Sequence, residues 1–326
     1  MYLAPDGDEV DIADAAAGFL AAAMPIDRLH AADCADMNAD LRRQIGEMGW
    51  FALALPECDG GSGLSAVEHA LFFREVGRQC GPIDVLTQCL AAMVVDDADL
   101  RASLISGETA IALAVRDGAQ MRLLGPAYAT HALEVGHDYA CVTALSGIVS
   151  DNRPSLDPSL SMRVTAGFAV SAATDNNRDW GHIWRMGALG TAAMLVGIAE
   201  ASLDQIVEYA KVRETFGKKI GSWQAVRHPC ADMAVRLEAA RSQLWFAAAA
   251  LKEGRTDAPV HLDAAKLLAN QAAMANADTN IQLHGGIGVT DEHSAHLFLK
   301  HALVLSRLFG SKRSLLGRLL HASVDN

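Results

Sequence analysis

Apolar residues recur every three or four positions through most of the chain, which is the spacing of one face of an α-helix. The longest such stripe alternates steps of four and three, as in a helix that packs on others along its whole length. Its members are Met233, Leu237, Ala240, Leu244, Ala247 and Leu251. The pattern predicts a mainly α-helical protein that ends in a four-helix bundle.

The stretch from 109 to 176 has a different pattern. Short apolar runs at 111–115 and 139–145 are separated by turn residues such as Asp117-Gly118, and 162–173 adds one or two similar runs. Runs of this length, bounded by turns, are typical of β-strands. We therefore predict three parts in a mainly α (α+β) protein: an N-terminal helical domain at 1–108, a reduced β domain at 109–176 and a C-terminal helical bundle at 177–326.

Composition agrees with this fold and excludes several functions. Hydrophobic residues make up 51% of the 326 residues and aromatic ones only 6%, with 9 prolines, which suits a helical globular protein. The net charge is −12 and no cluster of Lys and Arg covers a face, so we expect no nucleic-acid partner. The acidic start lacks the basic residues of a signal peptide, and no apolar run approaches membrane-spanning length.

The cysteines point to a reducing compartment. They show neither a CxxC pair nor a histidine at zinc-binding spacing, and they are Cys34, Cys58, Cys80, Cys89, Cys141 and Cys230. We expect reduced, mostly buried thiols in a cytoplasmic protein, with no metal site and no membrane as partner.

Residues 213–233 combine polar and helix-breaking residues between two long apolar-periodic segments. Arg213 closes one predicted helix, Phe216-Gly217 interrupts it and Gln224 begins the next. This arrangement suits a phosphate-bearing ligand, because a guanidinium pairs bidentately with phosphate and free N–H groups at a helix start point toward it. A solvated interhelical loop would explain the same residues. A second stretch, 282–288, carries glycines that let a ligand approach the backbone closely.

Together these stretches resemble the acyl-CoA dehydrogenase family, whose C-terminal domain carries RxxFGxxIxxxQ followed by ADM and then QxxGGxG. Residues 213–224, 231–233 and 282–288 match these patterns in order. A third match, PECDGGSGL at 56–64, is similar to the PExxGGxGL loop of the family's N-terminal helical domain. The resemblance covers residues 35–95 and 185–320.

The resemblance implies a site that is shared between subunits. In the family, the Arg of RxxFG, the Gln of the next helix and the QxxGG turn reach across a dimer interface to the ADP half of the partner's FAD. Arg213 would pair the pyrophosphate, and the double glycine would let backbone N–H groups approach it. The cofactor-binding residues expected here are Arg213, Phe216, Gln224, Gln282, Gly285 and Gly286.

The resemblance also implies catalytic residues that this chain lacks. Most members carry a Glu in an EGT triplet, and the corresponding residues are Phe309-Gly310-Ser311. A minority carry a Glu-Arg pair early in the first long C-terminal helix, where this chain has Gly187-Ala188. Glu200, Glu208 and Glu292 are the nearest acids in sequence, and none overlays either position at helical pitch. We therefore expect no catalytic residue in this chain.

The flavin-gripping part of the family's β domain departs as well. A TEPxxGSD-like strand and loop correspond to residues 114–120, which read AVRDGAQ, and no Trp-containing turn can be matched. A helper subunit is expected to lose the residues that hold its own flavin ring and to keep those that reach the partner's FAD. Some family members that shorten steroid side chains are α2β2 heterotetramers of this kind, and 290–293 and 308–311 look like that subgroup.

The leading hypothesis is therefore a subunit that pairs with a full-length acyl-CoA dehydrogenase homologue in an α2β2 complex. It would complete the partner's FAD site, while the partner binds the acyl-CoA and desaturates its thioester, for which a steroid side chain is one candidate. Two alternatives remain. The chain could be a purely structural relative that binds neither FAD nor CoA, or a homodimeric dehydrogenase with an unorthodox base.

Overall fold

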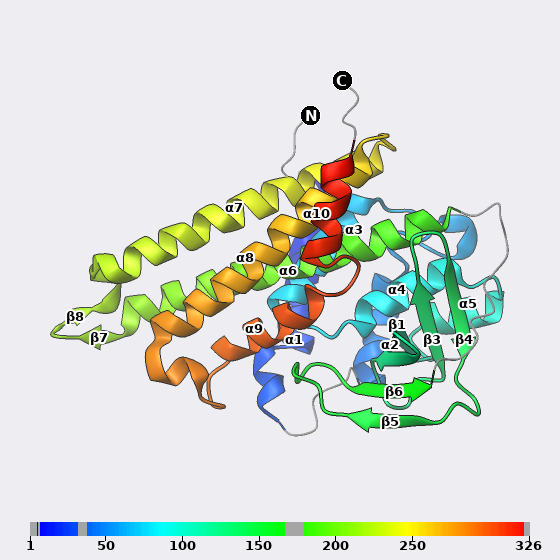
Figure 1. Cartoon of the computed structure of the whole chain (residues 1–326), viewed down its shortest axis with the longest axis horizontal. Coiled ribbons are helices and arrows are strands. Elements are labelled where there is room, and N and C mark those ends of the chain that lie inside the picture. The colour runs from blue at the N-terminus through cyan, green and yellow to red at the C-terminus, as the bar shows by residue number, and fades with distance from the viewer. Residues whose placement is uncertain (1–4, 6, 32–37, 167–178, 323–326) are drawn as a thin grey trace. The chain divides into compact units, whose positions relative to one another are not determined.

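The computed structural model describes residues 5, 7–31, 38–166 and 179–322. Along the sequence, helices come before and after a small β-sheet, as the colours of Figure 1 show. The predicted mainly α (α+β) fold, with helical N- and C-terminal parts and a small sheet between them, is confirmed.

The N-terminal part consists of short and medium helices. The α-helices are α1 (Asp8–Ala23), α2 (Ala39–Glu47), α3 (Ala66–Arg78), α4 (Asp84–Val94) and α5 (Ala98–Ile105), and the 3-10 turns are η1 (Ile26–His30), η2 (Trp50–Ala52) and η3 (Glu57–Asp59). The double glycine of residues 56–64 has a packing cause. A Cβ on Gly61 would lie 2.0 Å from the carbonyl oxygen of Leu55, so no side chain fits there. This motif therefore shapes the chain and is not a phosphate loop.

Six strands form the sheet, in the order β4-β3-β1-β2-β6-β5. They are β1 (Ile111–Asp117), β2 (Gln120–Leu124), β3 (His131–Val135), β4 (Ala140–Ala144), β5 (Ser150–Arg153) and β6 (Met162–Ala166). The strands predicted at 111–115 and 139–145 are β1 and β4. The run predicted at 162–173 is β6 as far as residue 166, and the rest lies outside the described residues. β1 pairs with β3 in parallel, while the other described neighbours in this sheet are antiparallel.

Long helices make up the C-terminal part. They are α6 (Trp180–Val212), α7 (Gln224–Lys252), α8 (Ala258–His284), α9 (Ala295–Leu305) and α10 (Lys312–His321), with β7 (Glu214–Thr215), β8 (Lys218–Lys219), η4 (Ile220–Ser222) and η5 (Gly285–Val289) between them. Figure 1 shows α6, α7 and α8 running side by side. The apolar stripe predicted on α7 is buried from Met233 to Ala247, and only its last member, Leu251, is half-buried.

The chain forms two compact units that are interleaved in sequence. One comprises Met1–Ala31, Ala70–Cys80 and Ala188–Asn326, and the other comprises Ala32–His69 and Gly81–Gly187. The predicted limits of the three parts stay predictions. The limit at 108 falls between α5 and β1, and the limit at 176 lies outside the described residues.

Helix α6 corrects one expectation from the sequence. By length and composition it is able to cross a membrane, whereas we expected no such apolar run. Its most apolar window is 89% buried within the fold, however, which is how the core helix of a bundle behaves. Three cysteines, Cys80, Cys89 and Cys141, are buried and Cys58 is exposed, while Cys34 lies outside the described residues.

Candidate functional site

The stretch predicted to bind phosphate is a hairpin between α6 and α7. β7 and β8 pair with Thr215 opposite Lys218, so only Phe216 and Gly217 form the turn. Both have positive φ, at 51° and 73°, as a type I′ turn requires. A bulky residue is rarely found at positive φ. Phe216 nevertheless occupies this position with 95% of its surface exposed.

Arg213 and Gln224 flank this hairpin. Arg213 directly follows α6, and its backbone N–H donates to the carbonyl of Tyr209 at 2.9 Å, while its side chain is exposed. Gln224 is the first residue of α7 and is also exposed. Both side chains can therefore reach a molecule outside this chain.

The two lysines of the hairpin have partners of their own. Lys219 pairs with Glu214 at 2.8 Å and donates to the carbonyl of Val212 at 3.1 Å. The ammonium of Lys218 lies 5.7 Å from the ring centre of Trp223, within reach of a cation–π interaction. Arg213 is thus the cation at this end best suited to an external phosphate.

The QxxGG turn begins where α8 ends. Gln282 is exposed in the last turn of α8, and Gly285 has a φ of 68°. A Cβ on Gly285 or Gly286 would meet no heavy atom within 4 Å. Gly288 differs, because its Cβ would lie 2.7 Å from the carbonyl oxygen of Ile281. Packing therefore requires a small residue at Gly288, whereas Gly286 has no neighbour in this chain that would exclude a side chain.

Aromatic contacts connect the turn to the end of α6. The ring of His284 lies 4.4 Å from that of Tyr209 and 4.4 Å from that of His293. Its Nδ1 lies 2.8 Å from the carbonyl oxygen of Asn280, and burial lowers the pKa of His284. The amide of Gln205 contacts both Asn280 and Ser294 at 2.8 Å. The sequence motifs gave no sign of Tyr209, although it lies one helical turn before Arg213, and they included His293 only as part of the run 290–293.

These contacts place the predicted cofactor residues at one end of the bundle. In Figure 1 the β7–β8 hairpin extends beyond the ends of α6 and α7, and the C-terminal end of α8 lies on the same side. Arg213, Phe216, Gln224, Gln282, Gly285 and Gly286 are all exposed there. The residues fit the phosphate-bearing half of a dinucleotide, because they offer a guanidinium, amides and open backbone. Their role stays a prediction.

Phe309 and Gly187 are the residues that the sequence comparison predicts at the two positions of the family's base, and neither is an acid. Phe309 is 7% exposed and has a φ of 51°, so the chain turns sharply there. Gly310 follows at a φ of 133°, and a Cβ on it would lie 2.9 Å from Cδ2 of Leu315. Gly187 is buried within α6.

The three nearest acids in sequence are engaged elsewhere. Glu200 is 6% exposed and lies between guanidinium groups of three arginines: Arg241 at 3.3 Å, Arg78 at 3.4 Å and Arg74 at 3.6 Å. Glu208 is exposed and pairs with Lys211 at 2.5 Å. Hydrogen bonds from its own backbone N–H and from Thr290 lower the pKa of Glu292. A catalytic base usually has a raised pKa, whereas that of Glu292 is lowered.

The stretch at 114–120 forms the β1–β2 hairpin. Gly118 turns the chain with a φ of 60°. The guanidinium of Arg116 pairs with Glu134 of β3 at 3.1 Å, and the hydroxyl of Tyr139 donates to the same carboxylate at 2.8 Å. The carboxylate of Glu134 thus has its hydrogen-bond partners within this part of the chain. Within the described ranges, no three His, Cys, Asp or Glu side chains are placed to hold a metal ion.

Comparison with known families agrees with these motifs. Residues 184–322 match the acyl-CoA dehydrogenase C-terminal domain, and residues 6–98 match the acyl-CoA dehydrogenase N-terminal domain.

Two curated relatives come from Mycobacterium tuberculosis. The acyl-CoA dehydrogenase FadE34 is 35% identical over 287 residues, which cover 81% of this chain but only 40% of FadE34. The acyl-CoA dehydrogenase IpdE2 is 34% identical over 278 residues, covering 84% of this chain and 83% of IpdE2. The chain thus spans less than half of one relative and most of the other.

Solved structures share the fold at lower identity. A chain of the ChsE4–ChsE5 complex from Mycobacterium tuberculosis aligns over 100% of both chains, with a TM-score of 0.82 and 20% identity. A chain of the Tcur3481–Tcur3483 steroid acyl-CoA dehydrogenase aligns over 96% of this chain and 97% of its own, with a TM-score of 0.79 and 22% identity. Butyryl-CoA dehydrogenase from Megasphaera elsdenii covers 98% of this chain and 99% of its own, with a TM-score of 0.82 and 18% identity. On its sequence motifs, its fold and its two family domains, this chain belongs to the acyl-CoA dehydrogenase family.

Proposed function

We propose that this chain is a subunit of a flavin-dependent acyl-CoA dehydrogenase complex and that it completes the FAD site of a larger homologue. The observation that carries the proposal is a combination. Residues suited to the phosphates of a dinucleotide are exposed at one end of the bundle, while Phe309 and Gly187 occupy the positions where the motif spacing predicts the family's base. A subunit that completes a partner's FAD site needs phosphate-binding residues but does not need a base of its own.

The cofactor-facing residues have distinct roles in this proposal. Arg213 would bind the pyrophosphate with a planar pair of N–H groups. Gln224 and Gln282 would bind polar groups of the ADP half, and the backbone at Gly285-Gly286 would lie against it. When bound, FAD supplies the hydride acceptor of the desaturation. This chain's own residues would hold the cofactor and keep water away from it.

The surface around these residues supports a partner. Phe216 is 95% exposed, and Val212, Val235 and Val289 are 67%, 70% and 67% exposed. Exposed apolar groups gathered on one region commonly mark a protein interface. Phe216 also keeps a left-handed backbone conformation, which costs about 1–3 kcal/mol. A residue held in this way and fully exposed is suited to contact another molecule.

The partner would supply the chemistry. Removing a proton next to the thioester carbonyl needs a positioned base, which contributes about 10²–10⁴ in rate. The partner would provide that carboxylate and bind the acyl-CoA. An α2β2 assembly in the cytoplasm and a steroid side-chain thioester as substrate complete the proposal. They draw support from fold neighbours that include the ChsE4–ChsE5 complex and a steroid acyl-CoA dehydrogenase with two named components.

The test is to purify the chain alone and together with a full-length acyl-CoA dehydrogenase homologue from the same source. We expect the chain alone to lack flavin absorbance and acyl-CoA-dependent reduction of an acceptor dye, and the complex to have both. A yellow, active homo-oligomer of this chain would support the homodimeric alternative with an unorthodox base. If the complex forms but the partner binds flavin equally well without this chain, the result would support the structural alternative.

Arg213→Ala provides the sharper measurement within the complex. Charge-assisted hydrogen bonds are worth about 1.5–3 kcal/mol each, so the dissociation constant of FAD should rise about 10- to 100-fold. Arg213→Lys should recover part of this loss, because an ammonium lacks the planar fork. The matched control is Lys211→Ala, which removes the same charge two residues earlier from a side chain paired with Glu208. An unchanged constant in Arg213→Ala would refute this role.

A further inference from the structure

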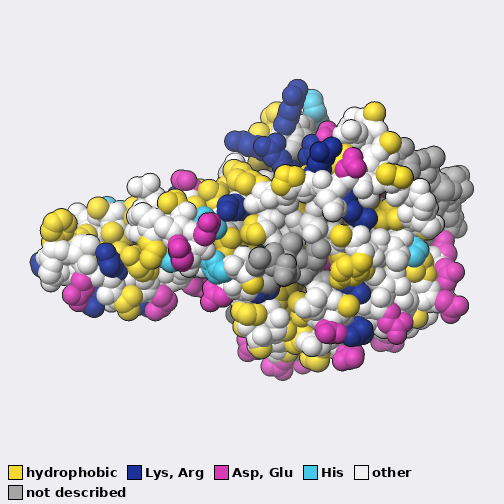
Figure 2. Space-filling model, turned by 90° about the horizontal axis from the view of Figure 1, so that it is seen from below, with side chains coloured by type: hydrophobic (Ala, Val, Ile, Leu, Met, Phe, Trp, Pro, Cys, Tyr) yellow, Lys and Arg dark blue, Asp and Glu magenta, His cyan; other side chains and the backbone are white. Residues whose placement is uncertain are grey.

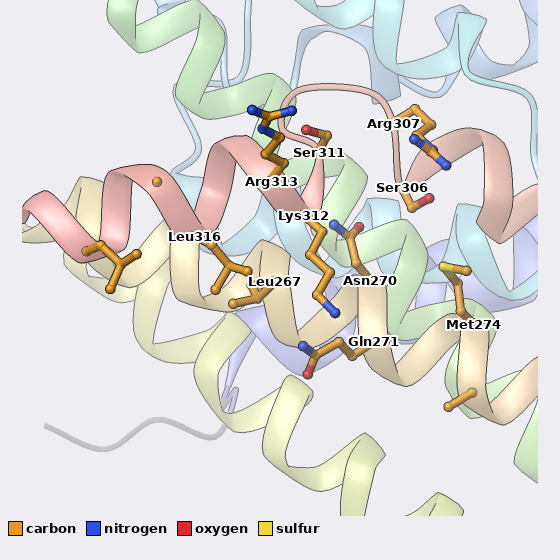
Figure 3. A pocket seen from close by; sticks show the side chains of 13 residues that line it. Leu267, Asn270, Gln271, Met274, Ser306, Arg307, Ser311, Lys312, Arg313 and Leu316 are labelled. Carbon is orange, nitrogen blue, oxygen red and sulfur yellow. The ribbon is translucent and has the colours of Figure 1, made fainter.

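A large pocket lies between α8, α10 and the loop that joins α9 to α10, the loop that also carries Phe309 and Gly310. Its volume is about 1040 Å³. Figure 3 shows Leu267 and Leu316 facing each other on one side and Asn270 with Lys312 beside them. Figure 2 shows Lys and Arg side chains gathered at the top of that view, on the face that carries α10.

The floor of the pocket holds a buried hydrogen-bond donor. Asn270 is only 4% exposed, and its Oδ1 accepts a hydrogen bond of 3.1 Å from Nζ of Lys266, which is fully buried. That bond fixes the orientation of the amide, and Nδ2 at its other end has no hydrogen-bond partner among the described residues. An unsatisfied buried donor is costly. An acceptor from a ligand in the pocket would satisfy it.

The charged residues that line the pocket in the described part of the chain are all positive. They are Arg307, Lys312 and Arg313, and no carboxylate is among these described lining residues. Lys312 is also the first residue of α10, where free backbone N–H groups favour an anion. In a chain with a net charge of −12, a pocket without an acid is selective for a negatively charged group.

The rest of the lining is apolar and aliphatic. The large apolar side chains of the lining are Leu267, Met274, Leu316 and Leu320, and no aromatic residue is among the described lining residues. A nucleotide base is normally held by stacking on aromatic rings or by hydrogen bonds to its edges. An aliphatic wall gains free energy instead by removing hydrocarbon from water, at about 25 cal/mol per Å².

From these observations we propose that the pocket binds an amphipathic anion. The head, a carboxylate or a phosphate, accepts hydrogen bonds from Nδ2 of Asn270 and from Lys312. The aliphatic body lies along Leu267, Leu316 and Leu320. The site is separate from the flavin-facing loops, so the proposal stands or falls independently of the proposed function.

The experiment is isothermal titration calorimetry of the full chain with four probes. These are dodecanoate below its micelle concentration, dodecyl phosphate, dodecyltrimethylammonium and ADP. We expect the two anionic amphiphiles to bind at one site per chain, and their relative affinities identify whether the head is a carboxylate or a phosphate. We expect no binding of the cationic amphiphile or of ADP.

Two exposed lysines provide a matched pair of variants. Lys312→Glu should weaken dodecanoate binding by about tenfold or more, because it removes a charge-assisted contact. Lys211→Glu makes the same charge change at an exposed position of α6 that does not line the pocket, and affinity should stay within about twofold since an exposed charge is screened. Asn270→Asp keeps the size of the side chain and its contact with Lys266 but replaces the donor, and it should abolish binding.

Each other outcome would overturn the proposal. Binding of ADP without the amphiphiles would make the pocket a nucleotide site. Equal binding of cationic and anionic amphiphiles, or equal losses in Lys312→Glu and Lys211→Glu, would show that no specific anion contact exists. No binding of either anionic amphiphile would show that the pocket does not take this class of ligand.

Discussion

Replacing Lys266 with methionine should stabilise the protein at neutral pH and remove a pH dependence that the lysine creates. Lys266 is fully buried in α8. Its Nζ donates to Oδ1 of Asn270 at 3.1 Å and to the carbonyl of Leu305 at 3.0 Å, and both of these acceptors are neutral. Burial lowers the pKa of Lys266 from 10.5 to about 7.

The magnitude follows from that pKa. The unfolded chain binds the lysine proton below pH 10.5 and the folded chain binds it only below about pH 7. Each pH unit between these values is worth about 1.4 kcal/mol. The lysine therefore lowers the free energy of unfolding by about 4 kcal/mol at pH 7 and by about 2 kcal/mol at pH 9. Methionine removes this cost but also two hydrogen bonds of about 1 kcal/mol each, which leaves a gain of about 2 kcal/mol at pH 7.

The assay is urea unfolding followed by circular dichroism at pH 7, 8 and 9. The advantage of Lys266→Met over the wild type should shrink by about 2 kcal/mol between pH 7 and pH 9, because the wild type gains stability as pH rises. Lys211→Met, at an exposed position, serves as the control and should follow the wild type at each pH. Parallel curves for Lys266→Met and the wild type would refute the assignment of a buried, neutral lysine.

Three further predictions concern the flavin-facing end and the bundle core. Gly286→Ala should leave the melting temperature unchanged, because a Cβ there meets no atom, yet weaken FAD binding in the complex; Gly61→Ala, with a Cβ 2.0 Å from a carbonyl oxygen, should instead unfold the chain at lower temperature. Burial lowers the pKa of His284, so stability should fall as pH drops below about 6.5, and His284→Phe should reduce that fall in thermal melts. Glu200→Gln should cost about 1.5–3 kcal/mol, since it removes a buried carboxylate that accepts charge-assisted hydrogen bonds from Arg78 and Arg241, whereas Glu208→Gln at the surface should stay within about 0.5 kcal/mol in urea unfolding.

Local patterns predicted the elements well. The stripe that begins at Met233 is periodic over many turns, and such a long periodic pattern predicts a helix whatever that helix packs against. The strands at 111–115 and 139–145 were bounded by turn residues, which act locally. Local sequence says nothing, however, about which strands pair, so the parallel β1–β3 pairing could not be predicted.

The site was predicted only as far as the motifs reach. Arg213 and Gly286 stand out by residue type, and the structure places them at the same end of the bundle. Tyr209 and His293 contribute by stacking on His284, and Tyr209 belongs to a segment far from the other two in sequence. Lys266 was missed for a related reason, because a lysine in an amphipathic helix is normally exposed. Only the tertiary structure reveals its burial and the pocket beside it.

The close packing of α3 on α6 has a consequence for how the chain folds during synthesis. A Cβ on Gly77 of α3 would lie 2.0 Å from the carbonyl oxygen of Met194, and one on Gly197 of α6 would lie 2.0 Å from that of Arg74. Helix α3 thus fits against a helix that leaves the ribosome more than a hundred residues later. Contacts so distant in sequence form slowly. The apolar side chains of α3 therefore stay uncovered while the intervening residues are made, which makes this segment a natural binding site for chaperones on the nascent chain.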